Sequence, residues 1–311
     1  MKTLFTIFLS CSMAGVAWAQ GCSSAGFCTM GALKADQKFS AQKRLKLNYI
    51  EVTQLIATSG FGETINATTL DVALTLGTKN SFQIRLPYVW VNGPLANTEG
   101  FGDVYLTYTR SLIKEKDYQL NASLGTKIPR FTTNLTTPEG LPLPMYYSPS
   151  LGTYDLIAGV SFINKKWLLG IGYQQVVSGN PIDNQFNPQA WEGTPLAEQA
   201  ARYDASMNLE RGADIMLRIE RNIRRGRYNF FVGAMPVYRI TADRMTDAEG
   251  REIAIDSPTG LAITGIVGGG YRFNAHSSLK LFYGRRLSKK PYNGDGLMKE
   301  DVGTIAYEFR F

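Results

Sequence analysis

The sequence has 311 residues, a formal net charge of +7 and a single histidine, His276. Charged residues make up 19% of the chain, below the roughly 25% of soluble domains. One histidine excludes a multi-histidine metal centre within one chain, and no apolar run beyond the N-terminus approaches the roughly 18 to 20 residues of a membrane-spanning helix.

Residues 1–19 have the pattern of an export signal. Lys2 gives a basic start, Leu4 to Leu9 form an apolar stretch, and Ala17-Trp18-Ala19 is a small-x-small cleavage site. We therefore predict that the mature chain begins at Gln20 and is exported.

Export changes what the cysteines imply. Cys22 and Cys28 remain in the mature chain, with five residues between them. In an oxidising compartment such a pair forms a disulfide, and free thiols are the alternative. A metal site is disfavoured because no histidine or third cysteine completes the ligand set.

Residues 44–311 are predicted to form strands, because apolar and polar residues alternate along them with a period of two. Phe82, Ile84 and Leu86, for example, alternate with Gln83 and Arg85. We predict twelve strands, at about 44–55, 67–78, 81–91, 103–113, 118–128, 153–163, 166–177, 211–223, 227–240, 261–273, 277–287 and 301–311. Their lengths and even number are those of a bacterial transmembrane barrel.

The connections between these strands alternate in length. The short ones are tight and polar, at about 79–80, 114–117, 164–165, 224–226 and 274–276. The long ones lie at about 56–66, 92–102, 129–152, 178–210, 241–260 and 288–300. This asymmetry and the aromatic residues near strand ends favour an all-β, antiparallel, up-and-down barrel in the outer membrane. The alternative is a secreted β-sandwich or solenoid.

The face opposite the apolar one is predicted to line a wet lumen. A charge left unpaired in hydrocarbon costs several kcal/mol, so the restriction of charged residues to one face is informative. The lumen-lining candidates are Arg85, Asp103, Lys127, Asp155, Arg218, Glu220, Arg239, Arg272, Lys280, Arg286 and Glu308. Their basic excess predicts a preference for anions.

The last residues alternate up to a terminal aromatic, with Tyr307, Phe309 and Phe311 at every second position. This ending resembles the C-terminal signal that outer-membrane proteins present to the barrel-insertion machinery. The resemblance implies that machinery as a partner.

Three motifs occur in a fixed order: Gly100-Phe101-Gly102-Asp103, then Thr126-Lys127-Ile128-Pro129, then Gly152-Thr153-Tyr154-Asp155. Their order over about residues 80–180 resembles the meta-pathway of phenol degradation family of outer-membrane transporters. The resemblance implies a channel related to those for hydrophobic compounds and long-chain fatty acids. In such channels an N-terminal segment plugs the lumen, so residues 20–43 form either a plug or a periplasmic tail.

The connections 129–152 and 178–210 are unusually apolar for exposed loops. They contain Tyr146, Tyr147, Phe186 and Trp191, among others. They collect a hydrophobic solute, fold over the mouth as a lid, or pack on lipopolysaccharide.

The sequence therefore predicts a passive outer-membrane channel for small solutes, including hydrophobic or aromatic ones. The main alternative is a structural or adhesive barrel. A phospholipase-like hydrolase is disfavoured because His276 falls in a short turn and adjacent Ser277 and Ser278 face opposite sides. We predict no cofactor and no nucleic-acid partner, since the basic residues are dispersed; membrane lipids and lipopolysaccharide are the expected surroundings.

Overall fold

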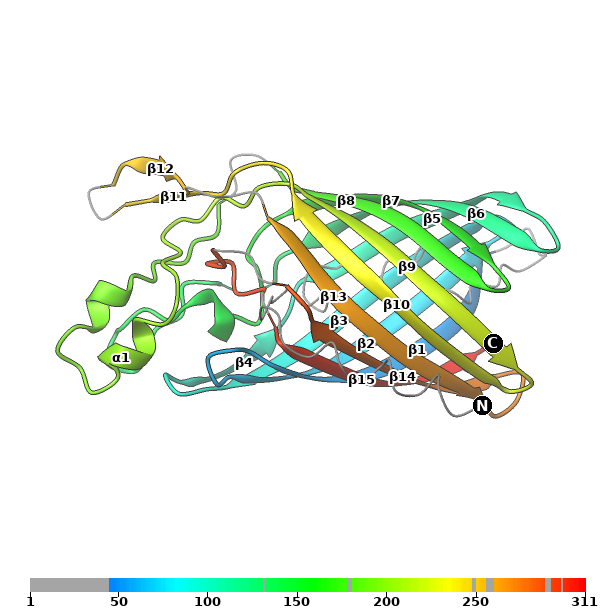
Figure 1. Ribbon diagram of the computed structural model, residues 1–311, viewed down its shortest axis with the longest axis horizontal. Helices are drawn as coiled ribbons and strands as arrows, with labels where there is room; N and C mark the ends of the chain where they lie inside the picture. The colour runs from blue at the N-terminus through cyan, green and yellow to red at the C-terminus, as the bar shows by residue number, and fades with distance from the viewer. Residues whose placement is uncertain are drawn as a thin grey trace, which may run out of the picture.

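Figure 1 shows the computed structural model, in which strands build an elongated cylinder with irregular segments gathered at one end. The structure describes residues 45–130, 132–177, 181–247, 250–255, 260–288, 292–297 and 299–311. The strands of the wall are β1 (Leu45–Thr58), β2 (Thr64–Leu76), β3 (Asn80–Asn92), β4 (Asn97–Phe101), β5 (Val104–Lys114), β6 (Tyr118–Ile128), β7 (Asp155–Asn164), β8 (Trp167–Val176), β9 (Asp214–Arg225), β10 (Tyr228–Arg239), β13 (Leu261–Arg272), β14 (Ser277–Arg286) and β15 (Asp301–Arg310).

The wall is closed. Antiparallel pairing runs from neighbour to neighbour around the sheet, and β1 pairs with the last strand, β15, as well as with β2. β4 and β5 both pair with β3 and are two parts of one wall strand, interrupted at Gly102 and Asp103. The result is a twelve-stranded antiparallel barrel, which confirms the predicted fold class.

The two faces of the wall differ as the alternation predicts. On β3, Phe82 and Leu86 are 39% and 40% exposed, whereas Gln83 between them is 6% exposed. The same pattern recurs on β8, where Ile171 is 49% exposed. The outside of the wall is thus apolar over its middle, as a lipid-facing surface must be. Tyr49 is one of the aromatic residues near strand ends that the sequence pattern assigns to the lipid–water boundary, but it points into the barrel and is 8% exposed.

The connections divide the barrel into two ends. One end, here the turn end, carries 77–79, 115–117, 165–166, 226–227 and 273–276; the other, the loop end, carries 59–63, 93–96, 129–154, 177–213, 240–260 and 287–300. The loop end also holds the short helix α1 (Ala197–Ala200) and the hairpin of β11 (Arg244–Thr246) and β12 (Glu252–Ala254), as Figure 1 shows.

Two of the predicted long loops are wrong. Residues 56–66 and 92–102 are largely strand, because β1 and β3 extend further than predicted and β2 and β4 begin earlier. The outward residues there, such as Thr58, Asn66 and Asn97, are polar, so the alternation of apolar with polar residues that marks a lipid-facing strand is lost.

Among the described residues, no helix is both long enough and apolar enough to cross a membrane. The predicted signal peptide, the segment 20–43, and the candidate disulfide of Cys22 and Cys28 lie outside the described residues.

Candidate functional site: the bore and its loop cap

A cavity of about 380 Å³ lies inside the barrel. Its wall consists of inward side chains from many strands, including Tyr49, Tyr105 and Phe231. At the loop end it is bounded by Met145 and Tyr146, and at the turn end it reaches the short connections, including those at 226–227 and 274–275. The cavity therefore follows the axis of the barrel between its two ends.

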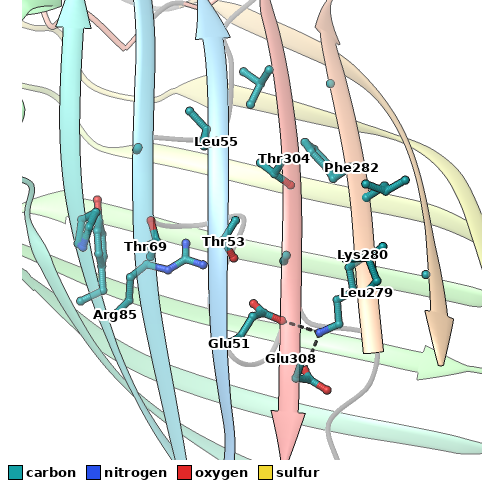
Figure 2. Close-up of a pocket in the computed structure, with 18 of the residues that line it drawn as sticks. Glu51, Thr53, Leu55, Thr69, Arg85, Leu279, Lys280, Phe282, Thr304 and Glu308 are labelled. Carbon is teal, nitrogen blue, oxygen red and sulfur yellow. Dashed lines mark hydrogen bonds and ion pairs between the residues drawn. The ribbon is translucent and has the colours of Figure 1, made fainter. Parts of the chain in front are cut away.

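The loop-end half of the cavity has mainly apolar walls, with Asp103, Asp295 and Lys299 as the charged residues that also line it. Leu55, Val89 and Val302 contribute aliphatic surface, and Figure 2 shows Leu55 and Phe282 on neighbouring parts of the wall. Space for the Phe231 ring depends on Gly268, since a Cβ there would lie 2.3 Å from the ring's Cζ. An apolar chamber of this kind can hold a solute without removing water from a charged group.

The turn-end half carries paired charges. Lys280 Nζ lies 2.6 Å from both Glu51 Oε2 and Glu308 Oε2, as Figure 2 shows. Arg85 Nη2 lies 2.7 Å from Asp71 Oδ2. Arg218 pairs with Glu220 and Arg310 with Glu308. Lys280 retains 32% exposure, so this half of the bore remains wetter than the chamber above it.

The long connections pack into an apolar cap over the loop end. A 3-10 helix at Met145–Tyr147 places all three side chains in buried positions. Phe186 and Trp191 are 0% and 1% exposed and belong to one apolar cluster with Tyr146 and Tyr147, and Trp191 Nε1 donates to the Pro142 carbonyl at 2.8 Å. The apolar residues predicted in these loops thus fold over the mouth, as a lid would.

A buried ionic network joins this cap to the wall. Lys127 Nζ lies 3.3 Å from Asp103 Oδ2 and 3.2 Å from Asp155 Oδ1, and none of the three side chains is more than 3% exposed. The Asp103 carboxylate also accepts hydrogen bonds from the Ser150 hydroxyl and, at 3.1 Å, from the Leu151 amide. Asp103, at the break between β4 and β5, thereby holds the connection 129–154 against the wall.

Two arginines extend the network to the other long connections. Arg211 lies 3.4 Å from Asp155 and 3.3 Å from Asp295. Arg239, on β10, lies 3.0 Å from Asp295 and 2.5 Å from Asp243. Asp214 pairs with both arginines, at 3.2 Å and 2.9 Å. The connections that contain Arg211, Asp243 and Asp295 are therefore fixed to the barrel through shared charges.

A second attachment centres on Glu63, in the turn between β1 and β2. The hydroxyls of Ser59 and Tyr203 both donate to its carboxylate. Tyr203 belongs to the connection 177–213 and packs at 4.9 Å from the Phe61 ring. Burial among these groups raises the pKa of Glu63 to about 7, although Arg202 nearby acts in the opposite direction.

The structure places the predicted lumen residues in three settings. Arg85, Asp103, Arg218, Glu220, Arg272, Lys280 and Glu308 contribute to the cavity wall. Lys127, Asp155 and Arg239 lie in the ionic network. Arg286 lies 2.8 Å from Glu300 near the loop end. Tyr307 and Phe309 are exposed on the outside of β15, and Phe311 is exposed at the chain end.

The sequence analysis missed several residues of the site. Glu51 and Asp214 lie on the inward face of predicted strands, so strand parity could have identified them. Glu63, Asp243 and Asp295 lie in connections, where no periodic signal indicates which side chains turn inward.

Several solved structures are similar to this chain. An outer membrane channel from Pseudomonas putida F1 matches with a TM-score of 0.56 at 13% identity, over 89% of this chain and 100% of that chain. The NanC porin gives 0.46 at 14% identity over 84% and 100% of the two chains. The CymD monoaromatic hydrocarbon channel gives 0.42 at 11% identity over 96% and 95%. No family model and no curated protein sequence matches the chain. The first likeness shows a common outer-membrane barrel fold.

The ionic network predicts a large effect of replacing Lys127. Lys127→Met leaves Asp103 and Asp155 buried without their shared cation, which should lower the free energy of unfolding by about 3–5 kcal/mol. Urea unfolding in lipid vesicles measures this change. The matched control is Lys165→Met, because its pair with Asp117 is 73% and 66% exposed and should contribute less than about 1 kcal/mol. Equal losses in the two variants would contradict the role given to the network.

Attachment of the cap through Glu63 should weaken as the pH rises. In the attached cap its carboxyl keeps the proton up to about pH 7, whereas a solvated carboxyl loses it near 4.5. Between pH 4.5 and about pH 7 the attached form therefore binds more protons than the detached form. Raising the pH through this range favours detachment, and raising it further has no additional effect through Glu63.

Hydrogen exchange of the backbone around Tyr203, corrected for intrinsic rates, measures cap detachment at pH 5 and pH 8. We expect faster exchange at pH 8 in the native chain and no pH difference in Glu63→Gln. Glu198→Gln, at an exposed position of α1, is the control and should behave as the native chain does. If the exchange rate of Glu63→Gln still differed between pH 5 and pH 8, a titrating group other than Glu63 would be responsible for the pH dependence.

Proposed function

We propose that the chain is an outer-membrane channel that takes up small solutes passively, including hydrophobic or aromatic ones. The observation that carries the proposal is the cavity that follows the barrel axis from the cap to the turn end. The likeness in fold to the Pseudomonas putida channel supports it. We place the short turns of the barrel on the periplasmic side of the outer membrane and the long connections on the exterior side, as is usual for such barrels.

The lining of the cavity favours solutes with an apolar body. At about 380 Å³, it is near the lower end of the roughly 300–1,000 Å³ of small-molecule sites. A solute entering below the cap first meets Leu55, Val89 and Phe282, and then the ion pairs of Lys280 nearer the periplasm. Apolar contact holds the solute, and the wetter exit releases it.

Passage requires the cap to move, because Met145 and Tyr146 lie at the top of the cavity. The segment around Asp295 is the part of the cap whose displacement would open the bore most directly, since Asp295, Gly296 and Leu297 all line the cavity. Asp295 pairs with Arg211 and Arg239, at 3.3 Å and 3.0 Å.

We expect no enzymatic role for His276. Its Nδ1 lies 2.9 Å from the Arg310 carbonyl oxygen, and its ring stacks near Phe309. These contacts hold the residue in the short connection 273–276 at the turn end, whereas the substrate of an outer-membrane phospholipase lies in the outer leaflet.

Uptake is tested by solute efflux from proteoliposomes. The native protein should release a small neutral aromatic solute faster than empty vesicles do. Asp295→Asn should raise the rate several-fold by weakening the hold of Arg211 and Arg239 on the cap. Asp117→Asn, at an exposed pair of the turn end, should leave the rate unchanged. A structural or adhesive barrel would release no solute in any of these proteins.

The charge of the lining predicts a preference for anions. Eight basic and five acidic residues line the cavity. Reversal potentials across a salt gradient in planar bilayers should show anions permeating more readily than cations, with the preference weakening as salt rises. Arg272→Gln, near the turn end, should reduce the preference. Cation selectivity at low salt would contradict this expectation.

A further inference from the structure

The outer face of the barrel carries an unusual set of side chains where β1 to β4 extend toward the loop end. Pairing register aligns the outward residues of these four strands in three rows across the sheet. We call these twelve residues the outer patch: Gln54, Thr68, Tyr88 and Phe101 in the row nearest the turn end, then Ile56, Asn66, Trp90 and Glu99, then Thr58, Thr64, Asn92 and Asn97.

The chemistry of the outer face changes sharply at the first of these rows. Toward the turn end, the outward residues Val52, Leu70 and Leu86 are apolar and 48%, 38% and 40% exposed. The row itself contains the Tyr88 and Phe101 rings, whose centroids lie 5.1 Å apart in an edge-on arrangement. Aromatic rings of this kind mark the boundary between hydrocarbon and water. The rest of the outer patch therefore lies just beyond the hydrocarbon and faces sideways.

Beyond this boundary the surface is polar and hollowed. A depression is lined by Gln54, Asn66, Trp90, Asn92, Asn97, Thr98 and Glu99. Register places Asn66 and Glu99 on either side of Trp90, with Asn92 and Asn97 in the next row. The Tyr88 ring supports the indole from below, at 4.8 Å between centroids.

This combination fits a sugar. An indole offers a flat apolar plate and one N–H donor, and the carbon-bound hydrogens on one face of a sugar ring stack on such a plate. Side-chain amides both donate and accept hydrogen bonds, as sugar hydroxyls require. Glu99 is the one charged residue among the twelve, so the outer patch lacks the cations that phosphate groups need.

We propose that the outer patch binds uncharged sugars in the oligosaccharide of lipopolysaccharide in the surrounding outer leaflet. Trp90 provides the stacking surface, and Asn66, Asn92 and Asn97 provide the hydrogen-bonding groups. The sideways position directly beyond the lipid boundary favours a membrane-anchored sugar over a soluble one. The inference uses the outer-membrane placement of the proposed function and does not depend on transport.

The test measures binding of two lipids to the detergent-solubilised protein. One is lipopolysaccharide with its core oligosaccharide, and the other is lipid A without it. We expect the first to bind more tightly. Trp90→Ala should weaken that binding about tenfold, and Trp90→Phe, which keeps a ring, should restore most of it.

The matched control is Trp167→Ala, at the outward-facing start of β8 on the turn end, which should bind as the native protein does. Heat-dependent migration in gels shows whether each variant keeps its folded barrel. Solute efflux should be unchanged in the Trp90 variants, so failure of sugar binding and failure of transport are separate results.

Three outcomes would overturn the proposal. The first is equal binding of lipid A and of lipopolysaccharide with its core, since acyl chains or phosphates would then carry the contact. The second is native affinity in a folded Trp90→Ala variant. The third is a protein dimer that Trp90→Ala dissociates, since the outer patch would then bind a second copy of the chain.

Discussion

The barrel wall depends on the pairing of β1 with β15. That pairing closes the sheet, so backbone donors and acceptors along the wall bond to neighbouring strands and none has to face hydrocarbon as a free edge. Closure also fixes which side chains point inward, because each residue of a paired strand faces either the bore or the membrane. Glu51 and Glu308, opposite each other across β1 and β15, reach Lys280 for this reason.

This constraint explains why the fold could be predicted from the sequence and where prediction failed. Lipid outside and water inside give the strands a period of two that is legible without homologues, as Phe82 to Leu86 illustrate. The signal disappears where a strand leaves the hydrocarbon. Thr58, Asn66 and Asn97 face water on the outside, so the ends of β1, β2 and β4 have the composition of loops although they are paired strands.

The side of the wall on which a charge lies was predictable, but its partners were not. Strand parity places Lys127 and Arg239 inside the barrel, and from parity alone they belong to an open lumen. Lys127 pairs with Asp103 and Asp155, which parity also places on the inner face. Two partners of Arg239, Asp243 and Asp295, come instead from connections of irregular conformation, and only the folded cap brings them within reach. Lys127 and Arg239 are consequently buried beneath the cap, whereas Asp103 and Asp295 of the same network and the more exposed Lys280 near the turn end line the cavity.

The cap is held by buried charges in addition to apolar contacts, and this has a consequence for its opening. The mutual attraction of buried ions roughly offsets the cost of removing them from water, so a complete network contributes little net stability while it strongly disfavours misplacement of any one member. The ion pairs of Asp295 with Arg211 and Arg239 therefore set the position of the closed cap but do not prevent it from opening. Water that enters on opening solvates all three charged groups together. The apolar cluster around Tyr147 and Trp191 gains no favourable solvation when water reaches it, so exposing this cluster costs free energy. The segment around Asp295 is for this reason better suited to move than the cluster beside it, although Leu297 of the segment is itself buried against Met145 and Leu209. The segment borders the cavity, as Tyr146 of the cluster also does.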